Sequence, residues 1–144
     1  AVPGIRRALD SARPDSFSKG MNDPEKIMLN ALPDGSLIAH RKALEAAGAA
    51  LALVARVSAP LKSLADQVVR SASSVPANLA EGHGRSGRDR LHHYRIAYAS
   101  AKEVDSHLRL LAHAGAVDVA GASGALRLFD EVRAMTWRLL HPRS

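Results

Sequence analysis

Four basic residues recur at intervals of seven in the second half of the chain: Arg88, Arg95, Lys102 and Arg109. Seven residues turn an α-helix by about 700°, close to two full turns, so these side chains would form a nearly straight stripe about 31 Å long. Such a row of cations fits phosphate groups, and binding would then weaken as salt rises. Arg85 and Arg90, at the turn before this segment, would extend the same basic face.

The scarcity of aromatic residues limits how such a face would bind nucleic acid. Phe, Trp and Tyr make up 3% of the chain, whereas single-strand binding platforms depend on aromatic side chains that stack on bases. We therefore expect contacts to phosphates or to nucleic-acid shape. The alternative is an ordinary solvated helix face, since Asp105 lies four residues before Arg109 and can pair with it.

Other chemistry is less well supported. The glycines of residues 82–87 (GHGRSG) are spaced as in a dinucleotide-binding loop, but that loop follows a strand, and here a helical pattern precedes it. A glycine-rich turn, whose N–H groups could still hold a phosphate, is therefore preferred. Asp89 and His92 have the spacing of a di-iron carboxylate bundle, but no second Glu-x-x-His occurs. With no cysteine and no G-x-S-x-G motif, we expect no metal, no cofactor and no enzymatic activity.

The elements that must position these residues are helices. Hydrophobic residues make up 47% of the chain and are mostly Ala, Leu and Val, a composition typical of packed helices. Apolar residues recur at helical spacing in four segments, about 37–58, 61–82, 87–114 and 118–140. Short connections join them, which predicts an all-α fold, an antiparallel up-down-up-down four-helix bundle.

Details of the four segments can be predicted as well. In the first, we expect Leu37, Leu44, Ala47, Leu51 and Val54 to face the core. Pro76 is expected to kink the second helix or to break one turn of its hydrogen bonding. Ser86 with Asp89 resembles a capping box at the start of the third, and Gly115 suits a left-handed position after it.

Ile96 and Leu110 project away from the inward stripe of the third segment. A helix that is apolar on more than one face usually buries a second surface, so we predict an oligomer interface there. The alternative is two isolated exposed apolar residues.

Residues 1–36 differ from the rest of the chain. They lack a sustained helical period and carry as many acidic as basic residues, so the net charge of +6 arises from residues 37–144. We expect a tail, partly disordered or lying on the bundle, with one short helix from Pro24 to Leu32. No apolar run approaches the ~18 residues of a membrane span, so a cytoplasmic protein without membrane contact is expected.

One segment resembles a family signature. Residues 67–82 (QVVRSASSVPANLAEG), followed by Gly84-Arg85, resemble the signature of the four-helix-bundle proteins also called 23S rRNA intervening-sequence proteins. Residues 96–104 resemble the next family motif, with Ala99 in place of its usual glycine. The resemblance covers about Ala52 to Leu140.

The resemblance implies an antiparallel four-helix bundle without known catalytic activity. It extends to the accessory variability determinant of diversity-generating retroelements, a basic pentameric ring that binds nucleic acid and works with a reverse transcriptase. It therefore implies a homo-oligomer of five copies and a reverse transcriptase as a partner.

We expect the motif residues to be structural. Antiparallel packing across a short turn would bring polar residues of the second and third helices together, and we predict a cluster that fixes their register. Its expected members are Arg70, Asn78, Glu81, Ser100 and Glu103. A buried Glu81 would need several hydrogen bonds or a basic partner such as Arg70.

Together these features predict a non-enzymatic, homo-oligomeric four-helix bundle that binds RNA or DNA through phosphate contacts. The alternative is a structural protein–protein adaptor that binds its partner through Ile96 and Leu110 and whose basic charge mainly aids solubility.

Overall fold

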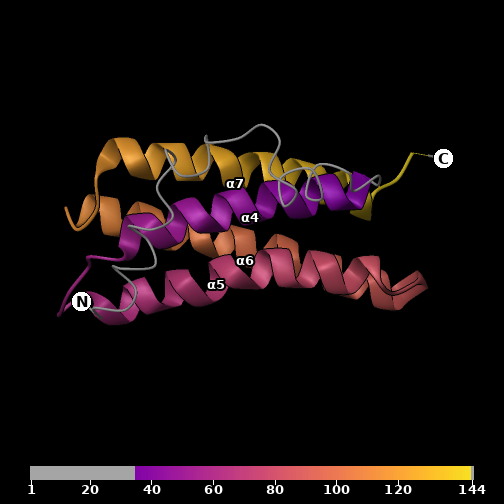
Figure 1. The fold of residues 1–144 in the computed structure, drawn as a ribbon, viewed down its shortest axis with the longest axis horizontal. Coiled ribbons are helices and arrows are strands. Elements are labelled where there is room, and N and C mark those ends of the chain that lie inside the picture. Colours follow the sequence, from indigo (N-terminus) through magenta and orange to yellow (C-terminus); the bar gives the residue numbers. More distant parts are fainter. Residues whose placement is uncertain (1–34, 144) are drawn as a thin grey trace, which may run out of the picture.

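The computed structural model describes residues 35–143 of the chain. This part folds into four α-helices: α4 (Gly35–Val54), α5 (Lys62–His83), α6 (Gly87–His113) and α7 (Val119–Leu140). Each helix packs against the next along the chain and α4 packs against α7, which closes a four-helix array (Figure 1). The predicted all-α four-helix bundle is confirmed.

Some helix ends differ from the predicted ranges. The first helix ends at Val54, because the Val57 N–H bonds the Val54 carbonyl at 3.1 Å and the chain turns there. α5 continues through the buried Pro76, whose missing N–H leaves the Ala72 carbonyl without its helical partner. The predicted tail ends too late, since Gly35 and Ser36 already belong to α4, and the rest of it, with its short helix, lies outside the described residues. None of the described helices has the length and apolarity needed to cross a membrane.

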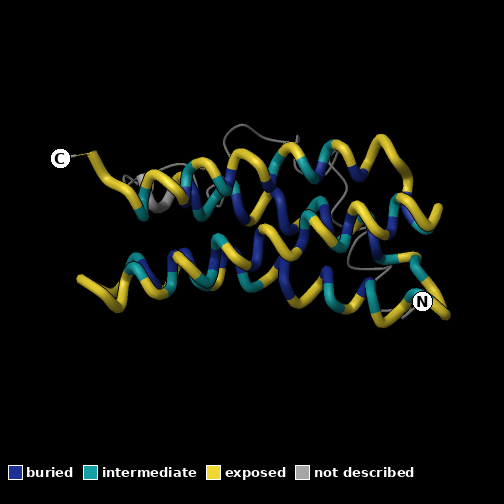
Figure 2. The backbone as a smooth tube through the Cα atoms, turned by 180° about the vertical axis from the view of Figure 1, so that it is seen from behind, coloured by how far each residue is buried: buried dark blue, intermediate teal, exposed yellow. Residues whose placement is uncertain are grey.

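The buried residues face the inside of the array on all four helices (Figure 2). α4 contributes mostly alanines: Ala39, Ala43, Ala46, Ala47, Ala50 and Val54. Larger side chains of the other helices fill the interior: Val68, Leu79, Leu108, Leu111 and Phe129. The predicted inward face of α4 is therefore partly wrong, since Leu44 is 45% exposed and the alanines, spaced by three and four, point inward.

The helix termini show which capping predictions hold. Gly115 has φ of +72° after the end of α6, as predicted for a left-handed position. Ser86 is the N-cap residue of α6, but its side chain makes no capping hydrogen bond, and the predicted capping box is wrong. Asp89 bonds Arg85 instead, at 2.7 Å. At α7 the Asp118 carboxylate accepts the Gly121 N–H at 2.8 Å.

Candidate nucleic-acid interface

The outward face of α6 carries the four residues of the basic stripe, Arg88, Arg95, Lys102 and Arg109, and all four are exposed. The buried residues of α6 lie on the opposite side of the helix: Tyr94, Ala97, Ala101, Val104 and Leu108 among them. The spacing of seven therefore places the cations in one row that points to solvent.

The four cations are not equivalent. Within residues 35–143, Arg88 and Arg95 form no ion pair or hydrogen bond through their side chains. The Arg109 guanidinium donates to Asp105 at 2.7 Å, and this bond raises the pKa of Arg109. The Lys102 ammonium lies 5.9 Å from the centre of the Tyr98 ring. Among the arginines of the stripe, Arg88 and Arg95 are thus the ones without a partner in the described part of the chain.

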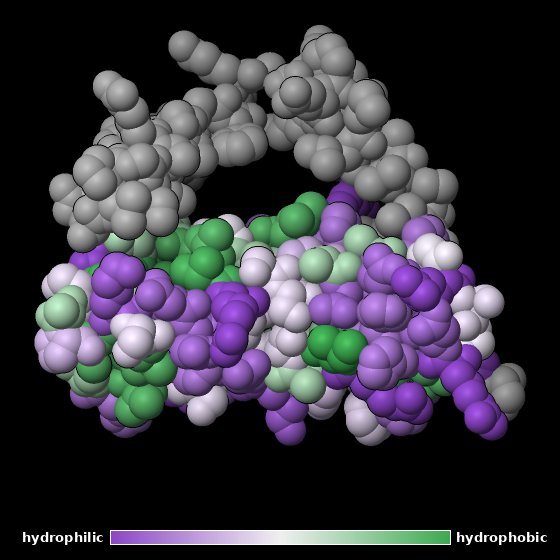
Figure 3. All heavy atoms as spheres, turned by 90° about the horizontal axis from the view of Figure 1, so that it is seen from below, coloured by the Kyte–Doolittle hydropathy of each residue, from purple (hydrophilic) through white to green (hydrophobic). Residues whose placement is uncertain are grey.

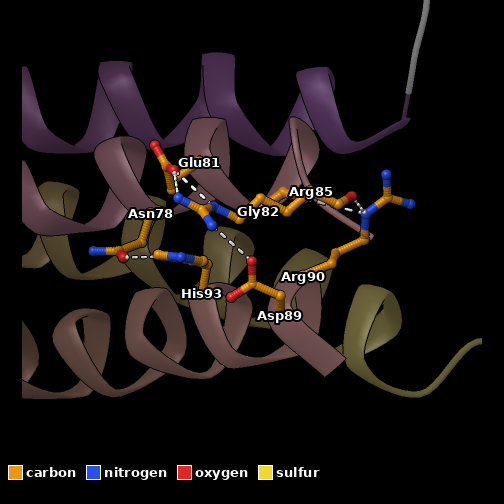
Figure 4. Close-up of polar contacts among 7 residues, drawn as sticks. All are labelled: Asn78, Glu81, Gly82, Arg85, Asp89, Arg90 and His93. Atoms are coloured by element: carbon orange, nitrogen blue, oxygen red, sulfur yellow. Dashed lines mark hydrogen bonds and ion pairs between the residues drawn. The ribbon is translucent and has the colours of Figure 1, made fainter. Parts of the chain in front are cut away.

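Arg90 does not belong to this stripe, because its side chain caps the C-terminal end of α5 (Figure 4). Its Nε donates to the carbonyls of Gly82 at 3.1 Å and Arg85 at 2.7 Å, and its Nη2 donates to the His83 carbonyl at 3.2 Å. The last carbonyls of a helix lack intrahelical partners, and a cation nearby also interacts favourably with the helix dipole. The guanidinium of Arg90 therefore already donates its hydrogen bonds to backbone carbonyls of the turn between α5 and α6.

Arg85 is also engaged. It pairs with Glu81 at 2.6 Å and with Asp89 at 2.7 Å, and so bridges the last turn of α5 and the first turn of α6 (Figure 4). These bonds raise the pKa of Arg85, and the bond from Arg85 lowers the pKa of Asp89. The two carboxylates carry more negative charge than the single Arg85 guanidinium carries positive charge. The side chains of Glu81, Arg85 and Asp89 together are therefore not a cationic site.

A polar cluster links α5 to α6, with a membership different from the predicted one. The Asn78 amide donates to the Ser74 carbonyl at 2.9 Å and to the Ser74 hydroxyl at 3.0 Å. Across the interface, the Ser100 hydroxyl donates to Ser74 Oγ at 2.9 Å. His93 Nδ1 donates to Asn78 Oδ1 at 3.1 Å (Figure 4). These bonds fix the register of the two helices.

Asn78 and Ser100 are the predicted members that the structure brings into this cluster. Arg70 bonds Gln67 on its own helix, and Glu81 is exposed beside Arg85 rather than buried. Glu103 is exposed as well. A step of three residues rotates a side chain by about 60° around a helix, which turns Glu81 and Glu103 away from the interface that holds Asn78 and Ser100.

Sequence reasoning missed Ser74 and His93. The spacing of four between Ser74 and Asn78, and of seven between His93 and Ser100, was the available signal, since each pair lies on one helix face.

The glycine of the predicted signature has a packing role. A Cβ at Gly82 would lie 2.6 Å from Cε1 of Tyr94, the buried tyrosine of α6. Because real side chains do not approach so closely, a glycine at this position lets α6 place its aromatic ring against α5.

Exposed apolar residues are spread over all four helices. Leu110 is 55% exposed, whereas Ile96 is half-buried. Figure 3 shows one face of the molecule, on which hydrophobic side chains form separate patches among hydrophilic ones. A shallow groove also lies between α4 and α7, with Leu53, Ala125 and Leu128 in its wall and Arg127 and Glu131 at its edge.

Residues 35–143 contain no group of three or more His, Asp or Glu side chains that could hold a metal ion. The pair Asp89/His92 thus has no third ligand from this part of the chain.

Two comparisons with known proteins complete the description. The family model described as 23S rRNA-intervening sequence protein matches residues 36–138. The search of curated proteins gave no match.

Proposed function

Since the chain belongs to the family of 23S rRNA-intervening sequence proteins, we propose that it is a nucleic-acid-binding protein without catalytic activity, which contacts phosphates through the outward face of α6. One observation carries this proposal: Arg88 and Arg95 are exposed in a row on one helix and form no ion pair within the described residues.

The reason is electrostatic. An unpaired guanidinium can form two parallel hydrogen bonds to a phosphate without first breaking an existing salt bridge. Each phosphate that it neutralises releases counterions, which supplies affinity at low salt. Arg85 and Arg90 would have to give up their present partners, so Arg88, Arg95 and Lys102 carry the proposed contact.

The test is fluorescence anisotropy with a structured RNA and a duplex DNA at about 50 to 200 mM salt. The logarithm of the association constant should fall linearly with the logarithm of the salt concentration. R88Q/R95Q should weaken binding on all sequences and reduce the slope by about 2, because each arginine neutralises about one phosphate. R56Q/R127Q is the matched control, because it removes the same charge from two arginines outside α6.

Equal losses in both double variants would show that net charge alone attracts nucleic acid. A salt slope that R88Q/R95Q leaves unchanged would place the contact elsewhere. No binding at about 50 mM salt would favour the alternative function, a protein–protein adaptor that uses Ile96 and Leu110.

We further propose that the chain forms a homo-oligomer through the surface around Leu110. The support is its exposed apolar side chain, 55% accessible on an otherwise polar helix face. Five copies are what the family resemblance implies, and assembly would repeat the basic stripe around the oligomer. Native mass spectrometry should give the mass of a multimer, and L110E should release monomers while L44E, at another exposed leucine, should not. A monomer for the unmodified chain would overturn this proposal.

A further inference from the structure

Aromatic side chains meet at the surface between α6 and α7, where Trp137 and His141 are exposed and Tyr98 is half-buried. Trp137 is 51% exposed, and its indole stacks on the His141 imidazole with ring centres 3.7 Å apart and an angle of 29° between the planes. Tyr98 of α6 approaches the indole with a centre-to-centre distance of 6.1 Å. We call Tyr98, Trp137 and His141 the aromatic cluster.

Cations of the basic stripe border this cluster. The Lys102 ammonium lies 5.9 Å from the centre of the Tyr98 ring. Arg95 precedes Tyr98 by three residues, so the two lie on neighbouring positions of the α6 surface, and its guanidinium is unpaired within the described residues. An aromatic surface and two exposed cations thus lie side by side.

The His141 imidazole stacked on Trp137 indicates which kind of group can lie on the indole ring. A flat nitrogen heterocycle already lies on the Trp137 ring, in the geometry that a stacked nucleobase takes. His141 is exposed and follows the end of α7, where its Nδ1 donates to the Trp137 carbonyl at 3.0 Å. A ligand that displaced the ring would break this hydrogen bond and the stacking contact, and would occupy the indole face instead.

The charged border argues for nucleic acid rather than for a protein on this surface. The core of a protein–protein interface is depleted of charged residues, whereas base-stacking sites on proteins combine aromatic rings with a cationic path for the phosphates. Lys102 and Arg95 provide such a path beside the ring of Tyr98.

We propose that the aromatic cluster stacks an unpaired base of a single-stranded nucleic acid, with the base taking the place of His141 on the indole and Arg95 and Lys102 holding neighbouring phosphates. This inference rests on the proposed function and adds to its phosphate contacts a preference for a strand with at least one unpaired base. The low aromatic content predicted the opposite, but content does not show that Tyr98 and Trp137 are neighbours.

The chain offers a direct probe, because Trp137 is its only tryptophan. Titration with a twelve-nucleotide oligo-uridine, and with oligo-thymidine of the same length, should quench the indole emission as bases stack. A blunt duplex of similar length should bind through phosphates without quenching. Equal affinity for the two single strands indicates stacking and phosphate contact alone, whereas tighter binding of RNA adds a contact to the 2′-hydroxyl.

Variants separate stacking from charge. W137A should weaken single-strand binding by about 5- to 150-fold, the usual contribution of a stacked base, and should leave the salt slope and duplex binding unchanged. W137F should restore most of the affinity, and H141A should retain or increase it. R95Q, in contrast, should lower the affinity for both the single strand and the duplex and should reduce the salt slope.

Unchanged indole emission with saturating single strand, or equal single-strand affinity of W137A and the unmodified protein, would overturn this inference and leave the proposed function intact. A fall in oligomer mass for W137A would overturn it in favour of a contact between subunits. If neither single strand nor duplex binds at about 50 mM salt, the proposed function fails as well, so the two failures are distinguishable.

Discussion

Single residues of the family signature act on packing and on the turn between α5 and α6. Gly82 makes room for Tyr94, and Asn78 joins His93 across the interface. The sequence indicated a structural role for the motif because its polar residues precede a short turn. It did not indicate that Arg90 closes α5, since a basic residue in a basic segment equally suits a ligand contact. Which role a side chain takes depends on the carbonyls near it, which only the folded turn brings together.

Gly82→Ala should lower the free energy of unfolding by about 1–3 kcal/mol, the usual cost of forcing extra volume into a packed site. The physical reason is the overlap of the new methyl group with the Tyr94 ring, which would lie 2.6 Å away. Urea denaturation followed by circular dichroism measures the change.

Gly84→Ala is the matched control for that substitution. Gly84 has an ordinary φ of −76°, and its nearest Cβ contact would be 3.6 Å, so the stability should stay the same or rise by up to about 1 kcal/mol. Equal losses of stability at both glycines would contradict the packing explanation.

His40 should make the bundle less stable in mild acid. Burial lowers the pKa of His40 below its ordinary value of 6.5, and the nearby His83 lowers it further. Between the two pKa values the unfolded chain binds more protons than the folded one, so stability is complete above about pH 6.5 and falls as the pH drops below it.

The measurement is the melting temperature between about pH 8 and 5. His40→Gln should reduce the decrease on acidification, while His113→Gln, at an exposed position near the end of α6, should leave it unchanged. An identical pH profile for H40Q and the unmodified protein would refute this role.

Among the helices, the number, order and approximate extent could be predicted from apolar spacing, proline and glycine. The inward face of α4 could not. Leucine is the more hydrophobic residue, so the pattern predicts Leu44 and Leu51 in the core. Leu51 does pack against the core, but Leu44 is exposed, because alanines recur along this helix from Ala39 onward and can face inward at several rotations. The large side chains of α5, α6 and α7 decide the matter, because they fill the interior and leave room only for small ones on α4.

Neighbouring substitutions in α4 should therefore show opposite sensitivities. Ala43 is fully buried, and Ala43→Leu should cost about 1–3 kcal/mol of stability through overpacking. Leu44 is 45% exposed, and Leu44→Ala should change stability by less than about 0.5 kcal/mol. Urea denaturation of both variants tests the orientation of the helix, and a larger loss of stability for L44A would show that α4 is rotated from its present position.

The end of α5 should depend on Arg90 more than on its neighbour. Arg90→Met keeps most of the apolar stem but removes the bonds to the carbonyls of Gly82 and His83, and should cost about 1–2 kcal/mol. Arg88→Met should change stability by less than about 0.5 kcal/mol, since Arg88 has no partner within the described residues. If the two variants melt at the same temperature, Arg90 does not cap the helix.

On the whole molecule, cations of the basic stripe lie beside the aromatic cluster, and the amino-acid composition could not show this proximity. Arg95 and Tyr98 lie on α6 and Trp137 on α7, and the antiparallel packing of these helices places the two rings beside each other. The basic stripe itself was predictable, because its period depends on helix geometry alone. The pairing of Arg109 with Asp105 was predictable too, from their spacing of four, and within the described residues Arg95 forms no ion pair.

The closed turn between α5 and α6 also bears on the order in which the protein folds. Arg90 reaches back eight residues to Gly82, and His93 reaches back fifteen to Asn78. Contacts between residues this close in the sequence cost little loop-closure entropy, so they are expected to form early in folding. The α5–α6 hairpin should therefore assemble first, with α4 docking its alanine face later. In native-state hydrogen exchange, the amides of the hairpin should be the last to lose protection.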